Sequence, residues 1–452
     1  MTGRIPPARL FAYAVPNLPH SLALLPVINF VPAFYAGDLG LPLATVGLML
    51  FATRLTDIIT DPIVGAWSDR ARTPWGRRKP FIVAGLPVIM AATWFVFVPG
   101  EGATATGLFW GLFFLYLGFT LVDLPYGAWG AELSDDYDER TRVAGWRSAM
   151  GAAGTLAALS IPALLALSGQ NDTRTFLLAM ALMFVVGQPL AFAYALWRVP
   201  EPAPQTIPAD KPLQSFWAQV RPVVRNGPFM RILAASVLAV GGLCIGATLN
   251  LIVTTHVIGA PEAFPYIIFA ENVASFLGLP VFLWIARRYG KHRSFAVAAS
   301  CYVLGFAVCF FYGQGDLWPF AVTRAVTGAA LLGITVVGAS LTADVLDRDR
   351  LETGEARTGL FFALLGMATK LSIAVGVLLG TTLPALGGFQ PSDPVHTPEA
   401  LLSLRLVYCF LAPAIMLPGI WLMWNHPLTR EVQQQLRREI DARRNTTAAV
   451  SA

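Results

Sequence analysis

Apolar stretches of about 20 residues recur along this sequence from one end to the other. A stretch of this length crosses the hydrocarbon core of a bilayer as an α-helix, because a helix satisfies its own backbone hydrogen bonds where no water is available. Hydrophobic residues make up 55% of the chain and charged residues only 13%. The stretches do not alternate polar with apolar residues, as the strands of a membrane β-barrel do. We therefore predict an all-α, multi-pass membrane protein.

Twelve such stretches can be placed along the chain, which predicts twelve transmembrane helices. Their approximate limits are residues 10–36, 43–67, 80–99, 104–131, 146–168, 175–197, 229–258, 263–286, 294–313, 317–345, 358–386 and 401–424. The first is longer than the apolar core of a signal peptide, so we expect it to be a membrane span. The four cysteines all fall inside spans without metal-ligand spacing, which indicates apolar packing.

Lysine and arginine residues cluster in the loops that follow the even-numbered spans. Arg77, Arg78 and Lys79 follow the second span, and Arg140 and Arg142 follow the fourth, whereas the alternate loops are mainly acidic. Because positively charged loops are retained in the cytoplasm, we expect both termini to be cytoplasmic in a bacterial-type inner (plasma) membrane. The net charge of +5 follows from this topology and therefore does not indicate a nucleic-acid partner. The expected partners are a small-molecule substrate and the membrane lipids.

A proline-rich segment separates the first six spans from the last six. Five prolines lie between Pro200 and Pro212, and they preclude a continuous helix there. In the segment that follows the last span, apolar residues recur at every fourth position beside arginines, which favours a helix on the membrane surface over a solvated one. The predicted organisation is an N-terminal six-helix bundle (1–199), a cytoplasmic linker (200–227), a C-terminal six-helix bundle (228–425) and a cytoplasmic amphipathic helix with a tail (426–452).

Two sequence blocks recur at corresponding places in the two halves. Gly-Arg-Arg-Lys at 76–79 follows the second span, and a related basic block at 287–291 follows the eighth. The pair Ala-Glu at 131–132, after the fourth span, matches Ala-Asp at 343–344, after the tenth. Parallel repeats of this kind place a substrate site near the middle of the membrane, between the two halves.

Two carboxylates, Asp57 and Asp61, lie one helical turn apart inside the second span. A charge near the centre of a bilayer helix costs about 2.5–3.5 kcal/mol, so such residues normally face a polar interior. At positions i and i+4 the two side chains share a face of the helix. There they can hold a monovalent cation such as sodium, or they can share a proton. Thr60 adds a hydroxyl beside them. Thr120 and Asp123 on the fourth span supply a second oxygen pair if the two helices pack together.

Three of the positive charges inside predicted spans, Arg54, Arg147 and Lys370, are candidates to pair with these carboxylates. Pairing with the carboxylates would lower the cost of burying both signs, and it would give the network a second arrangement when a cation leaves. The same pairing is compatible with a purely structural role for Asp57 and Asp61, so the two interpretations stay open at this point.

Four blocks resemble a known family of membrane carriers. They are residues 54–62 running into 69–80, residues 120–126, Arg147, and Ala343-Asp344 leading to Lys370. Together they are similar to the major facilitator superfamily and, within it, to the glycoside-pentoside-hexuronide cation symporters of the melibiose permease type. The resemblance covers nearly the whole chain. It implies the major facilitator fold, with two pseudo-symmetric six-helix bundles, and transport by alternating access.

The resemblance also implies roles for individual residues. Positions matching the two carboxylates and Thr120 bind the coupling cation in the family, and those matching Asp123, Arg147 and Lys370 shape the sugar site or its charge network. The expected function is therefore symport of a sugar, a glycoside or a related small organic solute with a sodium ion or a proton. No cofactor other than the coupling ion is implied, and a functional monomer is expected.

The chain departs from the family pattern around the substrate site. The segment 19–21, Pro-His-Ser, lacks the family's sugar-binding aspartate, and Gly127 stands where a tryptophan is expected. Sugar carriers use paired carboxylates and a stacked aromatic ring, so a less polar, amphipathic cargo such as a lysolipid is an alternative. Thr60 stands where the sodium-using member has an asparagine, which keeps proton coupling open beside sodium. A proton-coupled antiporter is a further alternative.

Four more residues are candidates for substrate contact or for the charge network: Tyr126, Trp129, His20 and Glu271. His20 and Glu271 have an equally simple structural interpretation, as buried groups that hydrogen-bond to another helix. Arg324 lies close to the end of its span, so its side chain is expected to extend towards the membrane surface.

Asp69, Arg70, Gly76 and Arg77 belong to the loop motif after the second span, and we expect them to form a gating latch at the cytoplasmic face. An enzyme is not expected. The five histidines are scattered, and the sequence contains no paired metal-ligand motif, no phosphate-binding glycine loop after a strand and no nucleophile elbow.

Overall fold

The computed structural model describes residues 4–100, 102–134, 136–201, 216–353, 358–427 and 431–433. Within these ranges the chain forms helices and no strand, apart from an isolated bridge between Thr73 and Gly76. Twelve helical stretches of the described chain are long and apolar enough to cross a membrane. The predicted all-α fold class with twelve spans is therefore confirmed.

The helices follow one another through short connections. In chain order they are α1 (Pro7–Ala14), α2 (Asn17–Asn29), α3 (Val31–Ala33), η1 (Phe34–Asp38), α4 (Leu43–Arg70), α5 (Lys79–Phe97), α6 (Ala105–Glu132), α7 (Tyr137–Leu167), α8 (Thr173–Arg198), α9 (Phe216–Arg225), α10 (Gly227–Val253), η2 (Thr254–Ile258), η3 (Pro261–Ala263), α11 (Phe264–Tyr289), α12 (Lys291–Val308), η4 (Cys309–Phe311), α13 (Leu317–Thr353), α14 (Thr358–Leu386), α15 (Pro398–Leu406), η5 (Val407–Leu411) and α16 (Ala412–Trp424). The first span is divided between α1 and α2 at Pro16, because proline lacks the N–H that would continue the helix.

The chain forms two compact units. Unit 1 contains the first six spans together with parts of later helices, and the remaining parts make up unit 2. Within unit 1 the amide of Leu43 donates to Oε1 of Gln390 at 2.9 Å, and the ring of Phe30 lies edge-on to Phe264 at 5.5 Å. The limits are Met1–Pro208, Ala247–Phe269 and Val377–Leu404 for unit 1, and Ala209–Gly246, Ala270–Gly376 and Arg405–Ala452 for unit 2.

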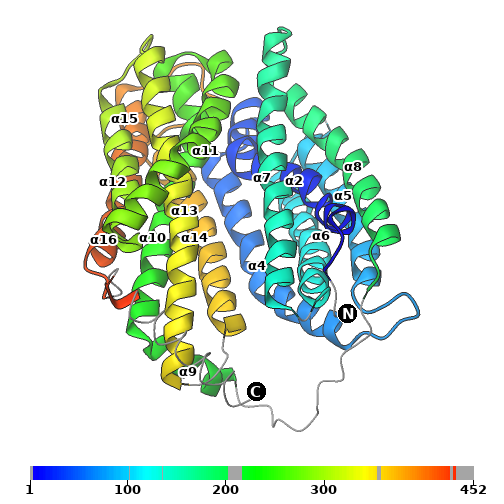
Figure 1. Ribbon diagram of the computed structural model, residues 1–452. Helices are drawn as coiled ribbons and strands as arrows, with labels where there is room; N and C mark the ends of the chain where they lie inside the picture. The colour runs from blue at the N-terminus through cyan, green and yellow to red at the C-terminus, as the bar shows by residue number, and fades with distance from the viewer. Residues whose placement is uncertain are drawn as a thin grey trace, which may run out of the picture. The chain divides into compact units, whose positions relative to one another are not determined.

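Close helix packing in unit 1 sets the position of its polar groups. In Figure 1, α4 and α6 run side by side, and α2 packs against α7 and α8. A side chain at Gly154 of α7 would bring its Cβ to 2.1 Å from the carbonyl oxygen of Leu18 on α2, so this approach requires glycine. The contact is reinforced where Asn17 Nδ2 donates to the Arg147 carbonyl at 2.9 Å. It places α2 directly beside the polar face of α7.

In unit 2, α12 packs against α13 and α16. The described part of the predicted linker ends in α9, and residues 202–215 lie outside the described residues. Most of the predicted C-terminal amphipathic helix and tail also lies outside them, so both of these assignments stay predictions.

Candidate functional site

A polar contact joins α4 to α6 inside unit 1. The hydroxyl of Thr120 donates to Oδ1 of Asp61 at 2.8 Å. Asp57 lies one turn earlier on the same face of α4 and is only 2% exposed. The structure therefore brings Asp61 and Thr120 together, as the sequence predicts if the two helices pack. Their role as cation ligands stays a prediction.

Thr60 does not join this contact in the structure. Its hydroxyl donates to the carbonyl of Thr56, on its own helix, at 3.1 Å. Serine and threonine commonly satisfy their hydroxyl in this way inside apolar helices. Of the two predicted hydroxyl ligands, Thr120 rather than Thr60 faces a carboxylate.

Arg54 neutralises the more buried of the two carboxylates. Its Nη1 lies 3.1 Å from Oδ2 of Asp57, one turn along α4. The guanidinium also lies over the ring of Tyr116 on α6, at 3.9 Å from the centroid. A buried charge is tolerated when it is paired in this way, and the ring adds a cation–π contact. The predicted pairing of an intramembrane arginine with Asp57 is therefore present.

A second charged cluster forms where α2, α6 and α7 meet. Asp123 of α6 is paired with Nη2 of Arg147 on α7, and both side chains are partly exposed, 30% and 27%. The Nε2 of His20 on α2 lies 3.6 Å from the same carboxylate oxygen. Arg147 also lies over the ring of Tyr126, 4.7 Å from its centroid. The structure thus brings together four of the residues that the sequence assigns to substrate contact or the charge network.

Trp129 is not part of this cluster. Its indole is fully buried, and Nε1 donates to the carbonyl of Pro200 at 3.3 Å. Tyr13 packs edge-on against the same indole at 5.7 Å. Trp129 therefore packs the core of unit 1, and the position next to Arg147 is Gly127, whose Cβ would lie 3.0 Å from Nη1 of Arg147.

The loop after α4 is held by a network of acids. Nη1 of Arg78 pairs with Asp69 at 2.6 Å, and its Nη2 pairs with Glu132 at 2.7 Å. Glu132 also pairs with Arg77 at 2.8 Å. Glu201 accepts hydrogen bonds from the backbone amides of Arg77 and Arg78, at 2.6 and 2.7 Å. The predicted latch residues Asp69 and Arg77 are thus joined through partners on three different segments.

In unit 2, Lys291 pairs with Asp344 at 2.6 Å. These residues occupy the places in the second half that match the basic loop block and Glu132 in the first. The predicted sequence repeat therefore corresponds to a repeated ion pair.

Replacing Gly76 with alanine is expected to weaken the latch. Gly76 has a φ of 107°, and a Cβ there would lie 2.1 Å from Oε2 of Glu201. We expect a loss of about 1–3 kcal/mol of stability from backbone strain alone, seen as a lower melting temperature of the detergent-solubilised protein. Gly100→Ala is the matched control, because Gly100 is a loop glycine with no neighbour within 4 Å of the added Cβ. Equal melting temperatures for the two variants would contradict the role of Gly76.

Glu271 and Arg324 form a buried ion pair in unit 2. Oε1 of Glu271 on α11 lies 2.6 Å from Nη2 of Arg324 on α13, and the two side chains are 9% and 1% exposed. The Arg324 guanidinium also lies over the ring of Phe306 at 4.7 Å. The prediction that Arg324 extends towards the membrane surface is therefore wrong, because a carboxylate at the same depth holds it in the core. Glu271 has the interhelical partner that its structural interpretation requires.

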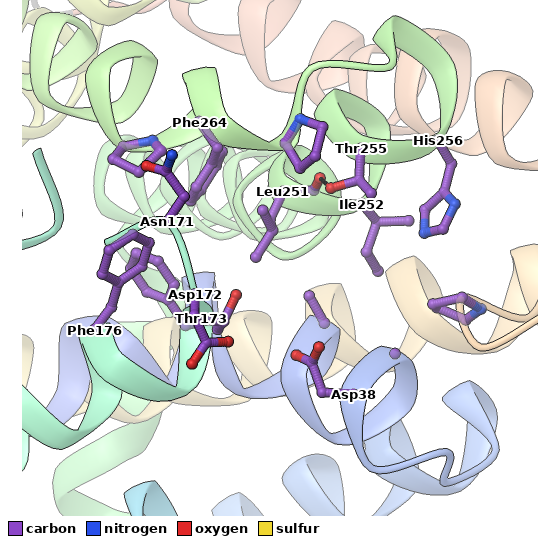
Figure 2. A pocket seen from close by; sticks show the side chains of 16 residues that line it. Asp38, Asn171, Asp172, Thr173, Phe176, Leu251, Ile252, Thr255, His256 and Phe264 are labelled. Carbon is purple, nitrogen blue, oxygen red and sulfur yellow. Dashed lines mark hydrogen bonds between the residues drawn. The ribbon is translucent and has the colours of Figure 1, made fainter. Parts of the chain in front are cut away.

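A pocket of about 310 Å³ lies at one end of unit 1. Figure 2 shows Asp38 and Asp172 along one side of it and Thr255 and His256 along the other. Burial, with a further contribution from the neighbouring Asp172, raises the pKa of Asp38 above its usual value, and Arg174 opposes this. The ring nitrogen Nδ1 of His256 lies 3.0 Å from Nε2 of His396. These residues lie at or near helix ends and carry no motif, so sequence reasoning missed the pocket.

Two functional candidates were missed although the sequence carries a signal for each. Gln188 on α8 contacts His20, and it is an amide inside an otherwise apolar span. Glu201 organises the latch from just beyond α8, where an acid follows the first proline of the proline-rich segment. Lys370 belongs to α14 in unit 2, and its membership of the charge network stays a prediction.

Known proteins of similar sequence cover nearly the whole length of the chain. The profile of a family described as MFS/sugar transport protein matches residues 12–430. A glucuronide carrier protein homolog of Escherichia coli is 22% identical over 96% of this chain and 95% of its own. A putative 2,3-dihydroxypropane-1-sulfonate exporter of the same organism is 25% identical over 98% of both chains. The crystal structure of the nucleoside transporter NupG is similar in fold, with a TM-score of 0.65 at 13% identity over 93% of this chain and all of that one.

Proposed function

The chain belongs to the MFS/sugar transport protein family and is a membrane transporter, not an enzyme, and we propose that it couples the uptake of a small polar organic solute to the inward movement of a cation. Its relatives are consistent with the glycoside-pentoside-hexuronide symporters that its motifs resemble. The proposal places it in a bacterial-type inner membrane with both termini in the cytoplasm, where it works by alternating access.

The observation that carries the cation half is the contact of Asp61 with Thr120. A carboxylate and a hydroxyl from two helices supply oxygen ligands at one point, with the Asp57 carboxylate one turn away. Sodium takes oxygen ligands of this kind, and a proton can bind the same carboxylate. When a cation binds, the Thr120 oxygen can turn from donating to Asp61 to ligating the ion. The ion would then replace the direct hydrogen bond as the link between α4 and α6.

The solute half is proposed to be the pair of Asp123 and Arg147. Both side chains are partly exposed, so a solute can reach them. An arginine offers several donors in one plane and binds carboxylates and sulfonates well. One relative is named a glucuronide carrier protein homolog and another a putative 2,3-dihydroxypropane-1-sulfonate exporter, and these names support an anionic sugar derivative or a small sulfonate as cargo. Tyr126 beneath the guanidinium keeps Arg147 in place.

Transport by the purified protein in sealed vesicles tests this proposal. We expect methyl glucuronide or 2,3-dihydroxypropane-1-sulfonate to accumulate when a sodium or proton gradient points inwards, and to accumulate less when the gradient is collapsed by an ionophore. Accumulation of a lysolipid instead would favour the amphipathic alternative. Solute movement opposite to the proton gradient would replace the symport mechanism with antiport.

A further inference from the structure

His20 lies in the apolar interior of unit 1 between polar groups of two other helices. Its side chain is only 7% exposed. Nδ1 lies 3.0 Å from Nε2 of Gln188 on α8, and Nε2 lies 3.6 Å from Oδ1 of Asp123 on α6. Phe119, one turn before Asp123, stacks on the imidazole with 4.3 Å between ring centroids. These contacts fix the ring plane and direct its Nε2 edge towards Asp123.

The orientation of the Gln188 amide sets which ring nitrogen carries the proton. In the orientation that the structure gives it, the amide nitrogen donates to Nδ1, which leaves the ring proton on Nε2. That proton then faces the carboxylate of Asp123. Gln188 is fully buried, and its Oε1 has no hydrogen-bond partner among the described residues. A buried polar group is rarely left in this state in a folded protein.

A second arrangement needs only a half-turn of the Gln188 amide. This exchanges the amide nitrogen and oxygen almost without changing the shape of the side chain. The oxygen can then accept a hydrogen bond from a protonated Nδ1, while the proton on Nε2 still faces Asp123. Gln188 can therefore hold the ring both neutral and doubly protonated, whereas an apolar residue could hold neither form.

The surroundings of the ring act in opposite directions on a positive charge: Asp123 favours it, whereas burial and Arg147 oppose it. Asp123 on α6 and Arg147 on α7 are the charged groups that face His20 among the described residues, and they form a pair of zero net charge. From α8 comes the neutral amide of Gln188. The phenol of Tyr13 on α1, which interacts with Asp123 and Arg147, donates to the Tyr126 carbonyl at 2.9 Å. A charged imidazole would share Asp123 with Arg147 and would lie against the face of Phe119.

We propose that His20 is a proton-binding residue of the Asp123–Arg147 site, and that Gln188 is the positioning residue that holds its ring in both protonation states. A proton on His20 gives Asp123 a second cationic partner and so loosens its hold on Arg147, which leaves the guanidinium available for the solute. The proposal rests on the proposed transport function for its meaning. Its test reads the protonation of the ring alone and needs neither a solute nor transport.

Nuclear magnetic resonance of isotope-labelled histidine in the full-length protein, held in lipid nanodiscs, measures which ring nitrogens are protonated. The His20 signal is identified by its loss in His20→Gln. We expect a neutral ring protonated on Nε2 alone at neutral pH and a ring protonated on both nitrogens at acidic pH. A neutral ring protonated on Nδ1, or a ring that stays singly protonated down to the pH at which the fold is lost, would overturn the proposal.

Two substitutions at position 188 give opposite expected results. Gln188→Met keeps the size of the side chain but removes both hydrogen-bonding functions, so the neutral ring should become a mixture of the two tautomers. Gln188→Glu offers only an acceptor when ionised, so it should favour a proton on Nδ1. Signals of His292 and His426, which belong to unit 2, serve as internal controls for the fold and should not change. An unchanged His20 signal in both folded variants would reject the positioning role of Gln188.

Asp123→Asn tests the partner on the other side of the ring. Removing the negative charge should shift the protonation of His20 to a more acidic solution by about one pH unit or more, since an opposite charge at this distance has an effect of that size. An unshifted titration in the folded variant would show that Asp123 does not stabilise the charged ring.

Discussion

Replacing Glu271 with leucine is expected to destabilise unit 2 more than the loss of any exposed ion pair. The substitution leaves the guanidinium of Arg324, which is 1% exposed, without its carboxylate partner at 2.6 Å. Breaking a buried ion pair by removing one partner typically costs about 3–5 kcal/mol, because a desolvated charge is left uncompensated. We expect a markedly lower melting temperature in detergent and a reduced yield of monodisperse protein.

The double variant Glu271→Leu/Arg324→Leu separates the effect of charge from that of packing. Removing both charges also removes their desolvation cost, so the double variant should recover most of the melting temperature that the single variant loses. Glu399→Leu, at an exposed acid in the first turn of α15, is the surface control and should change stability by no more than about 0.5 kcal/mol. A double variant as unstable as the single one would show that Glu271 acts through packing and not through Arg324.

The features that could be predicted from the sequence depend on local periodicity. Apolar length gave the twelve spans, because a bilayer allows few alternatives to a helix of about 20 residues. Asp57 and Asp61 are recognisable because a charge inside such a span is costly, and their spacing places them on one face. The contact of Asp61 with Thr120 could be predicted only on the condition that α4 packs against α6, and the sequence does not show that packing.

The features that escaped prediction depend on which helices meet. Trp129 is separated from Arg147 in the structure because its indole donates a hydrogen bond to the Pro200 carbonyl and packs against the Tyr13 ring. A linear sequence pattern does not reveal these contacts. The pairing of Arg324 with Glu271 could have been predicted from the positions of the two residues in their helices. Glu271 follows the first residue of α11 by seven positions, from 264 to 271, and Arg324 follows that of α13 by seven, from 317 to 324. Helices that begin on the same side of a membrane place such residues at the same depth.

Replacing Asp61 with asparagine is expected to abolish stabilisation by the coupling cation while leaving the fold intact. Asparagine keeps the size of the side chain and can still accept the hydrogen bond from Thr120, but it removes the charge that would attract a cation. A ligand that binds only the folded protein stabilises it by about 2.7 kcal/mol at one hundred times its dissociation constant. We expect sodium chloride to raise the melting temperature of the wild type above its value in choline chloride, and to have no such effect on Asp61→Asn.

Two threonine variants make this experiment specific to the geometry of the site. Thr120→Ala removes the hydroxyl that faces Asp61 and should weaken the response to sodium, whereas Thr60→Ala removes a hydroxyl that bonds to its own helix and should leave most of it. Asp38→Asn controls for the loss of an acid outside the cation site. If the melting temperature of the wild type responds to pH but not to sodium, and Asp61→Asn removes that response, Asp61 carries a proton. A full sodium response in Asp61→Asn would instead exclude this carboxylate from the coupling site. The purely structural role of Asp57 and Asp61 would then be the remaining interpretation.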